Sequence, residues 1–327
     1  MSIEIVLQQM IIIFILIGIG MVLYKKDMFS ENTSKQVSGV IVNITNPALL
    51  ICSALDDGPK VPLKELGISL GAYTIVYGIL IAAAFLIPYL LRVPRPQHYS
   101  YQMLTIFGNV GFIGIPLASA VLGPESLIFV SIYNLIFNIL IYTFGISVLE
   151  KASRQQALST PTEAEDTLLI SDADASTPTA GWKKLLNLGT ISSLVTIILY
   201  LAPIHVPIIV SSTADYIGRS TTLLSMLVLG VSVAQLAPKD IFTHPKLYGF
   251  TILRQVLLPI GCILLMRPFI TNTLIFNTMV LMLAVPAANM PLLLSKQLNL
   301  DTSTLSQAII LTTILSLITI PIVCLFL

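Results

Sequence analysis

The chain has 327 residues, of which 55% are hydrophobic and 10% are charged, and its formal net charge at pH 7 is +1. Because an ordinary soluble domain has about 25% charged residues, this composition excludes that class and indicates a polytopic membrane protein. The near-neutral charge gives no reason to expect nucleic-acid binding.

The apolar stretches predict an all-α fold that spans the lipid bilayer. A transmembrane helix needs about 20 predominantly apolar residues. On this basis the sequence predicts ten transmembrane helices, although the sixth is short. In chain order they cover residues 5–24, 35–55, 66–91, 102–122, 126–149, 186–201, 217–236, 248–266, 276–295 and 304–327.

Basic residues between the predicted helices are concentrated in one set of alternate loops. Cytoplasmic loops carry an excess of Lys and Arg, so this set is predicted to be cytoplasmic. Both termini are then extracytoplasmic, in a multi-pass protein of the plasma membrane. The basic set holds Lys25, Lys26, Lys35, Arg92, Arg95, Lys151, Arg154, Lys183, Lys184, Lys239, Lys246 and Lys296, whereas the opposite set holds Lys60, Lys64 and Arg267.

The segment of residues 150–181 differs in composition from the rest of the chain. It is rich in Ser, Thr, Ala, Asp and Glu and has no apolar periodicity, which predicts a disordered cytoplasmic linker. It separates residues 1–149 from residues 182–327, each with five predicted helices. Because five is odd, the second half enters the membrane in the opposite orientation, as in transporters built from inverted repeats.

The fourth and ninth predicted helices are interrupted near their middles. Proline removes a backbone donor and glycine weakens a helix, and in a membrane the freed polar groups are tolerated only inside protein or beside water. Interrupted helices at corresponding places in two halves point to a transporter's binding site. The candidate binding residues here are Asn109, Gly111, Gly114, Pro116, Pro286, Asn289 and Pro291.

Broken helices offer a specific kind of chemistry. The N-terminal ends of half-helices carry partial positive charge and free N–H groups, which suit an anion such as a carboxylate. Asn109 and Asn289 add amide donors and acceptors beside the breaks. These two side chains either contact substrate or satisfy the freed backbone groups, and the two roles are compatible.

Two other polar features fall within predicted helices. Asn43 and Asn46 precede Pro47 in the second helix, where they could line the same cavity, form an ion site or accompany a simple proline kink. Arg254 lies in the eighth helix and has three readings: a counter-charge for an anionic substrate, a donor to carbonyls of a broken helix, or a side chain that reaches the interface. For Asp215 and Arg219, four residues apart, a local helix ion pair is expected.

Several functions are not supported by the sequence. No Asp or Glu lies at the centre of a predicted helix, so a buried proton relay is not expected. Transport driven by membrane potential and coupling to sodium through Asn and carbonyl ligands both stay open. The three cysteines lack metal-ligand spacing, and no nucleophile–base pair appears at depth. We therefore expect neither an enzyme nor a cofactor nor a bound transition metal.

Several motifs together resemble the auxin efflux carrier family, which includes plant auxin carriers and bacterial malate or malonate permeases. These motifs are Asn109-Val-Gly-Phe-Ile-Gly114-Ile-Pro116-Leu, Arg254 followed by Pro259, Val285-Pro286-Ala-Ala-Asn-Met-Pro291, and the final helix from Leu305-Ser-Gln-Ala to Ile320-Pro321. Where plant members have Pro-Gln-Gly in the ninth helix, this chain has Pro286-Ala287-Ala288-Asn289. This difference, like the short linker, looks bacterial.

The resemblance implies two inverted five-helix repeats in which the broken fourth and ninth helices cross. It implies that Asn109 contacts substrate and that a transport part moves against a scaffold in an elevator-like cycle. A homodimer would suit a scaffold that has to stay still. The sequence thus predicts a secondary transporter of small organic anions, auxin-like or dicarboxylate. The alternative is a membrane sensor that binds a metabolite at the same crossing without moving it.

Overall fold

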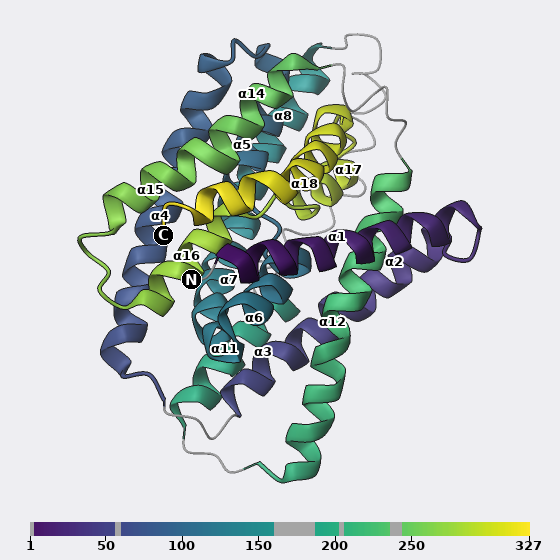
Figure 1. Cartoon of the computed structure of the whole chain (residues 1–327). Helices are drawn as coiled ribbons and strands as arrows, with labels where there is room; N and C mark the ends of the chain where they lie inside the picture. Colours follow the sequence, from purple (N-terminus) through teal and green to yellow (C-terminus); the bar gives the residue numbers. More distant parts are fainter. Residues whose placement is uncertain (1–2, 56–59, 160–186, 203–205, 236–243) are drawn as a thin grey trace, which may run out of the picture.

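The structure is a computed structural model that describes residues 3–55, 60–159, 187–202, 206–235 and 244–327. Apart from one isolated β-bridge, the regular structure of these residues is helical (Figure 1). The α-helices are α1 (Ile3–Lys25), α2 (Glu31–Val40), α3 (Asn46–Ala54), α4 (Leu63–Leu90), α5 (His98–Ile106), α6 (Ile115–Leu122), α7 (Leu127–Leu140), α8 (Ile146–Ser159), α11 (Leu188–Leu201), α12 (Ile208–Ala234), α14 (Pro245–Ile252), α15 (Leu258–Met266), α16 (Thr273–Ala284), α17 (Met290–Gln297) and α18 (Ser303–Cys324).

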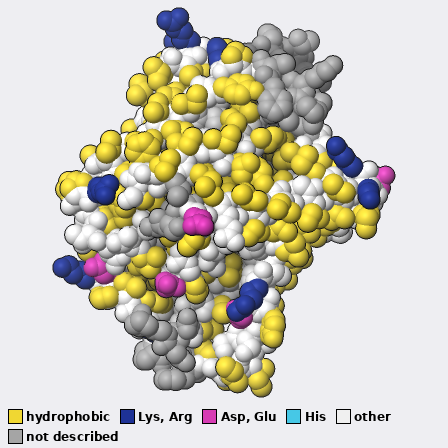
Figure 2. All heavy atoms as spheres, viewed as in Figure 1, with side chains coloured by type: hydrophobic (Ala, Val, Ile, Leu, Met, Phe, Trp, Pro, Cys, Tyr) yellow, Lys and Arg dark blue, Asp and Glu magenta, His cyan; other side chains and the backbone are white. Residues whose placement is uncertain are grey.

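Seven helical stretches among the described residues are long and apolar enough to cross a membrane. Three shorter apolar helices, Val110–Leu122, Leu188–Leu201 and Thr273–Ala284, fall within the predicted fourth, sixth and ninth spans. Figure 2 shows hydrophobic side chains over much of the visible face, with charged side chains in scattered places. The prediction of an all-helical membrane protein is confirmed, while the count of ten helices and the inverted repeats stay predictions.

The predicted linker of residues 150–181 begins inside a helix. α8 continues through Ser159, past the last buried apolar residue of its span, Leu149. The residues that follow include Glu150, Lys151 and Ala152, which are good helix formers and extend the helix beyond its apolar part. The remainder of the predicted linker, from residue 160 onward, lies outside the described residues.

Four of the described helices contain a π-helical turn, and in three of them a single residue separates the turn from a proline. The turns are η1 (Ile41–Thr45), η3 (Val110–Gly114), η5 (Ile141–Gly145) and η6 (Leu253–Leu257), and two short 3₁₀ turns occur at η2 (Arg95–Gln97) and η4 (Pro124–Ser126). The N–H of the residue before Pro47, Pro116 and Pro259 donates to the carbonyl five residues earlier in each case. The wider turn gives the proline ring room that a regular α-turn would not.

Glycines bring α1 and α12 into close backbone contact. A Cβ atom on Gly20 would lie 2.4 Å from the Leu227 carbonyl oxygen, and one on Gly230 would lie 2.2 Å from that of Ile17. Lipid tails provide no hydrophobic drive for helix association, so membrane helices gain stability from such close packing of small residues. The contact joins the start of the first half of the chain to the second half.

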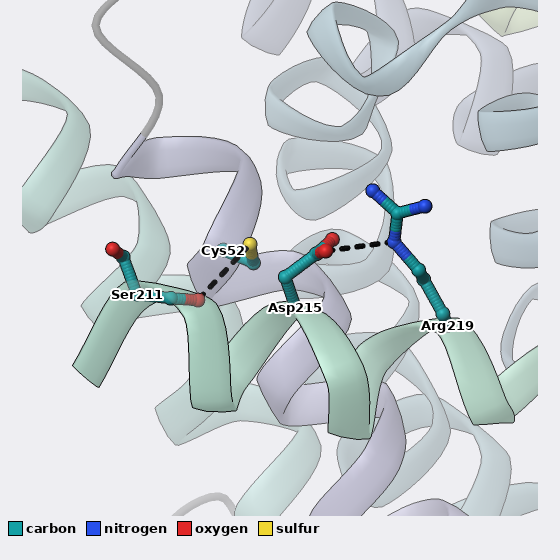
Figure 3. Close-up of polar contacts among 4 residues, drawn as sticks. All are labelled: Cys52, Ser211, Asp215 and Arg219. Atoms are coloured by element: carbon teal, nitrogen blue, oxygen red, sulfur yellow. Dashed lines mark hydrogen bonds and ion pairs between the residues drawn. The ribbon is translucent and has the colours of Figure 1, made fainter. Parts of the chain in front are cut away.

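α3 and α12 also pack together, in antiparallel directions. Figure 3 shows the Cys52 thiol of α3 pointing at the carbonyl of Ser211, 4.0 Å away on α12. One turn back on α3, the Leu49 backbone meets Gly218, where a Cβ would lie 2.8 Å from the Leu49 Cα. The expected ion pair on α12 is confirmed, because Arg219 Nε donates to Asp215 Oδ2 over 2.7 Å (Figure 3).

The two predicted helix breaks meet and hydrogen-bond to each other. α5 ends at Ile106 before η3 begins at Val110, and α16 ends at Ala284 before α17 begins at Met290. Between them, Gly108 and Ala287 form an antiparallel bridge. Its bonds run from Asn109 N to Pro286 O over 2.7 Å and from Ala288 N to Phe107 O over 2.9 Å. Each break thus supplies the partners that the other needs in a medium without water.

Arg254 stabilises this crossing with hydrogen bonds to the backbone at the end of α16. Its side chain is 2% exposed, and its Nη1 donates to the carbonyls of Leu283, over 3.0 Å, and Val285. These carbonyls stand at the C-terminal end of α16, where the break removes their helical donors. A Cβ on Gly108 would lie 2.7 Å from the Arg254 guanidinium, so a larger residue there would have to displace the Arg254 side chain. Of the three readings of Arg254, the geometry matches the donor to broken-helix carbonyls.

Replacing Gly20 by Ala tests the α1–α12 contact. The added methyl meets backbone that cannot yield without moving a helix, so we expect a loss of about 1–3 kcal/mol in stability. The melting temperature of the detergent-purified protein reports it. Gly18→Ala is the matched control on the same helix, since a Cβ there meets nothing within 4 Å. Equal melting temperatures for the two variants would contradict the close contact.

Replacing Arg254 by Met tests the support behind the crossing. The change leaves two buried carbonyls without a donor at about 1–3 kcal/mol each, and removal of a buried charge offsets part of this loss. We expect a lower melting temperature, with Arg254→Lys intermediate because one ammonium cannot copy the planar fork of donors. Arg267→Met is the control, since Arg267 is exposed. A wild-type melting temperature for Arg254→Met would refute the role.

Candidate functional site

A cavity of about 630 Å³ lies against the crossing. This volume falls within the range of small-molecule binding sites, about 300–1,000 Å³. Side chains from α2, α3, η3, α7, α11, α12, α17 and α18 contribute to its wall. The wall therefore contains both broken helices together with parts of both halves of the chain.

The cavity separates the predicted site residues into two groups. The first group lines it: Asn43, Asn46, Asn109, Gly111 and Asn289. The second group is buried and does not line it: Gly114, Pro116, Pro286, Pro291 and Arg254. Members of the second group shape and support the breaks. Gly114, for example, allows close packing against α16, because a Cβ there would lie 3.0 Å from the sulfur of Met282.

Asn109 combines a structural role with an unused donor. It is the N-cap of η3, and its Oδ1 accepts a hydrogen bond from Phe112 N over 3.1 Å. That bond assigns Oδ1 as the acceptor and leaves Nδ2 as the donor. Among the described residues Nδ2 has no partner, although the side chain is only 3% exposed. A buried donor without a partner costs about 1–3 kcal/mol, which a ligand with an acceptor oxygen would recover.

Asn46 joins the second predicted helix to the broken fourth one. Its Nδ2 donates to the Gly111 carbonyl over 3.1 Å, which satisfies a backbone acceptor at the break. A Cβ on Gly111 would lie 3.4 Å from this same nitrogen, so the backbone and the amide approach closely. The two polar breaks predicted from sequence are therefore neighbours on one wall of the cavity.

Asn289 marks the second half-helix end at the cavity. It is the N-cap residue of α17, but its side chain makes no capping bond. α17 has proline in its first turn, and the positive end of the helix lies beside Ala288, Asn289 and Met290 in the cavity wall. The half-helix that begins after Asn109 presents its N-terminal residues to the same space. Both ends favour negative charge.

Sequence reasoning missed Asn134 and Asn138 on α7, which also line the cavity. Asn134 Nδ2 donates to Ser193 Oγ on α11 over 2.9 Å, and Asn138 Nδ2 donates to the Asn134 carbonyl over 2.8 Å. The signal was present, because two Asn residues four apart in an otherwise apolar span lie on one helix face. A polar face inside a predicted span indicates a cavity or a partner helix.

Charged residues occur in the cavity wall only at Glu31, Lys35 and Lys296 among the lining residues. Lys35 pairs with Glu31 over 3.0 Å, with both side chains largely exposed. Lys296 is exposed near the C-terminal end of α17. The deeper wall is neutral and consists of amides, hydroxyls, backbone and apolar side chains. Among the described residues no group of three or more His, Cys, Asp or Glu side chains could hold a metal ion.

Comparison with known proteins agrees with this architecture. A family model described as a membrane transport protein matches residues 5–324. The matched range contains both helix breaks and every residue of the cavity wall. A comparison with curated proteins finds no match. Because the family match covers nearly the whole chain, the chain belongs to the auxin efflux carrier family of membrane transport proteins.

Proposed function

We propose that the protein is a secondary transporter of small organic anions, carboxylates in particular, in the plasma membrane. The observation that carries this proposal is the unpartnered Nδ2 donor of Asn109 at the helix crossing, in the wall of a 630 Å³ cavity. The two half-helix N-termini beside it favour an anion. No acidic side chain lines the deeper wall, so nothing there repels a carboxylate.

The position of the charged residues suggests which state of the cycle the cavity represents. Lys35 and Lys296 lie in the wall and belong to the loops predicted to be cytoplasmic. We infer that the cavity opens inward and that its mouth attracts anions from the cytoplasm. Uptake or release on the other side then requires a second state in which this mouth closes.

Some of the helix packing fits a division into a fixed scaffold and a moving transport part. α1 packs on α12, and α3 packs on both α11 and α12. In the proposed inverted repeat these are the first two helices of each half. The crossing also packs on α7 and α16, and α16 packs on α15 and α18. The two groups touch extensively, because η3 contacts α12 and α7 packs on α11. We propose that the first group is the scaffold and that the second carries the substrate in an elevator-type cycle.

Counterflow through purified protein tests the proposal directly. Proteoliposomes loaded with an unlabelled carboxylate should accumulate the labelled compound, for a panel of monocarboxylates and dicarboxylates. A sensor that only binds the same compounds would raise the melting temperature without counterflow. Counterflow of organic cations in preference to the carboxylates would refute an anion site.

Asn109→Ser separates the two roles of Asn109. Serine is also a good N-cap, so the variant keeps the bond to Phe112 N but loses the amide donor. We expect transport to be abolished with a melting temperature close to that of the wild type. Asn109→Ala should lose both the donor and the cap, with transport abolished and a small loss of stability. Full counterflow by Asn109→Ser would defeat the assignment of Nδ2 to substrate.

Lys296→Gln tests the inward mouth. Loss of a positive charge there lowers the local anion concentration, so KM for the cytoplasmic side should rise roughly twofold to tenfold at low ionic strength. The effect should shrink in high salt, because exposed charges are screened. Lys64→Gln is the matched control, since Lys64 is exposed and predicted on the opposite side. Equal KM changes in both variants would contradict the proposed orientation.

A further inference from the structure

Four buried side-chain oxygens on two packed helical segments have no hydrogen-bond partner within the described part of the chain. They are Thr45 Oγ1, Asn46 Oδ1, Thr221 Oγ1 and Ser225 Oγ, and the residues are 3%, 7%, 0% and 0% exposed. Thr45 and Asn46 lie where η1 meets α3, and the other two lie on α12. Buried polar atoms are nearly always satisfied, so this group calls for an explanation.

Most buried Thr hydroxyls among the described residues do have a partner, although that of Thr319 also lacks one. Buried Thr105, Thr196 and Thr251 each donate to the carbonyl four residues earlier, over 2.7–2.8 Å. Thr45 and Thr221 make no such bond. At Thr45 that carbonyl belongs to Ile41, and it accepts from Asn46 N across the π-turn. At Thr221 it belongs to Ile217, and it accepts from the Ser220 hydroxyl over 2.6 Å.

The packing of α3 and η1 on α12 indicates that these oxygens lie near one another. Cys52 faces Ser211 and Leu49 faces Gly218, so the segments are antiparallel. η1 packs on α12. If the antiparallel alignment continues for one helical turn beyond the Leu49–Gly218 contact, it places Thr45 near Thr221. Ser225 lies a further turn along the same face of α12, beside η1, with which α12 is in contact. Asn46 follows Thr45 in the sequence and extends the group toward the crossing.

The chemistry of this group suits a small monovalent cation. All four atoms are neutral oxygens, and Pro47 also deprives η1 of one N–H donor for its carbonyls. Unwound backbone and neutral oxygens coordinate Na⁺ in other membrane transporters. Asn46 Nδ2 is held by the Gly111 carbonyl, so Oδ1 is the atom left to bind. The nearest cation on α12, Arg219, is paired with Asp215 and its side chain is 76% exposed.

We propose that Thr45, Asn46, Thr221 and Ser225 form a Na⁺ site. Asn46 also donates to Gly111 in η3, at one of the two helix breaks. An occupied site would therefore hold the crossing of the two breaks in place. The Na⁺ would then be the coupling ion of the carrier, a step that rests on the proposed transport function. The existence of the site does not depend on transport and can be measured separately.

The melting temperature of the full-length protein in detergent tests the site. It is measured in NaCl and in choline chloride at equal ionic strength, with KCl as a third arm. At a Na⁺ concentration about ten times the Kd we expect a rise of about 3 °C in NaCl. Thr221→Val, which replaces one oxygen by a methyl, and Ser225→Ala should abolish the rise.

Thr196→Val is the matched control, because Thr196 is equally buried but its hydroxyl already has a partner. This variant should keep the full response to Na⁺. If the oxygens hold only water, the wild type melts at the same temperature in NaCl and choline chloride, and the site is refuted. A Na⁺ response that survives in Thr221→Val and Ser225→Ala refutes this location.

Counterflow in the two salts tests the coupling. Faster carboxylate counterflow in NaCl than in choline chloride, lost in Thr221→Val, supports Na⁺ as the coupling ion. Equal rates beside a Na⁺-dependent melting temperature refute coupling and keep a structural Na⁺ site. If no carboxylate is moved at all, the proposed transport function fails, while the melting experiment still decides the site.

Discussion

The whole architecture depends on how two interrupted helices form hydrogen bonds for the backbone groups that their breaks leave free, in a medium without water. The bridge between Gly108 and Ala287 provides two such bonds. The N–H of Asn109 donates to the carbonyl of Pro286, and the N–H of Ala288 donates to that of Phe107. Arg254 completes it by donating to carbonyls at the end of α16. Once these groups are paired, the two half-helix N-termini remain beside a cavity and are available to an anion. The proposed binding site therefore consists of the polar groups at the breaks that this pairing leaves free.

The neutrality of the deep wall has a further implication for selectivity. Amides such as those of Asn46, Asn109 and Asn138 offer directional hydrogen bonds without a fixed charge. A buried counter-charge would bind an anion tightly and slow its release, whereas dipoles and helix ends bind it reversibly. This arrangement suits a carrier, which has to release its substrate in every cycle. The charges at Lys35 and Lys296 are placed where water screens them.

Much of this could be predicted from the sequence, because the signals were local. Apolar runs gave the helices, and Gly, Pro and Asn within them gave the breaks at 108–117 and 285–292. The role of Arg254 could not be decided, since its three readings differ only in what surrounds the side chain. The division of the site residues between wall and support likewise required coordinates. Asn134 and Asn138 were missed because they lie on an unbroken helix, α7, and not at a break of the kind that Gly, Pro and Asn mark.

The π-turns before Pro47, Pro116 and Pro259 have a consequence for how the chain tolerates change. Each such turn contains one residue more than a regular turn, and one residue rotates everything that follows by about 100° around the helix axis. Deleting a residue within Ile41–Thr45 would therefore rotate Asn46 and the rest of α3 relative to α2. These segments accept a change of side chain more readily than a change of length. Single-residue insertions and deletions are the alterations they resist most.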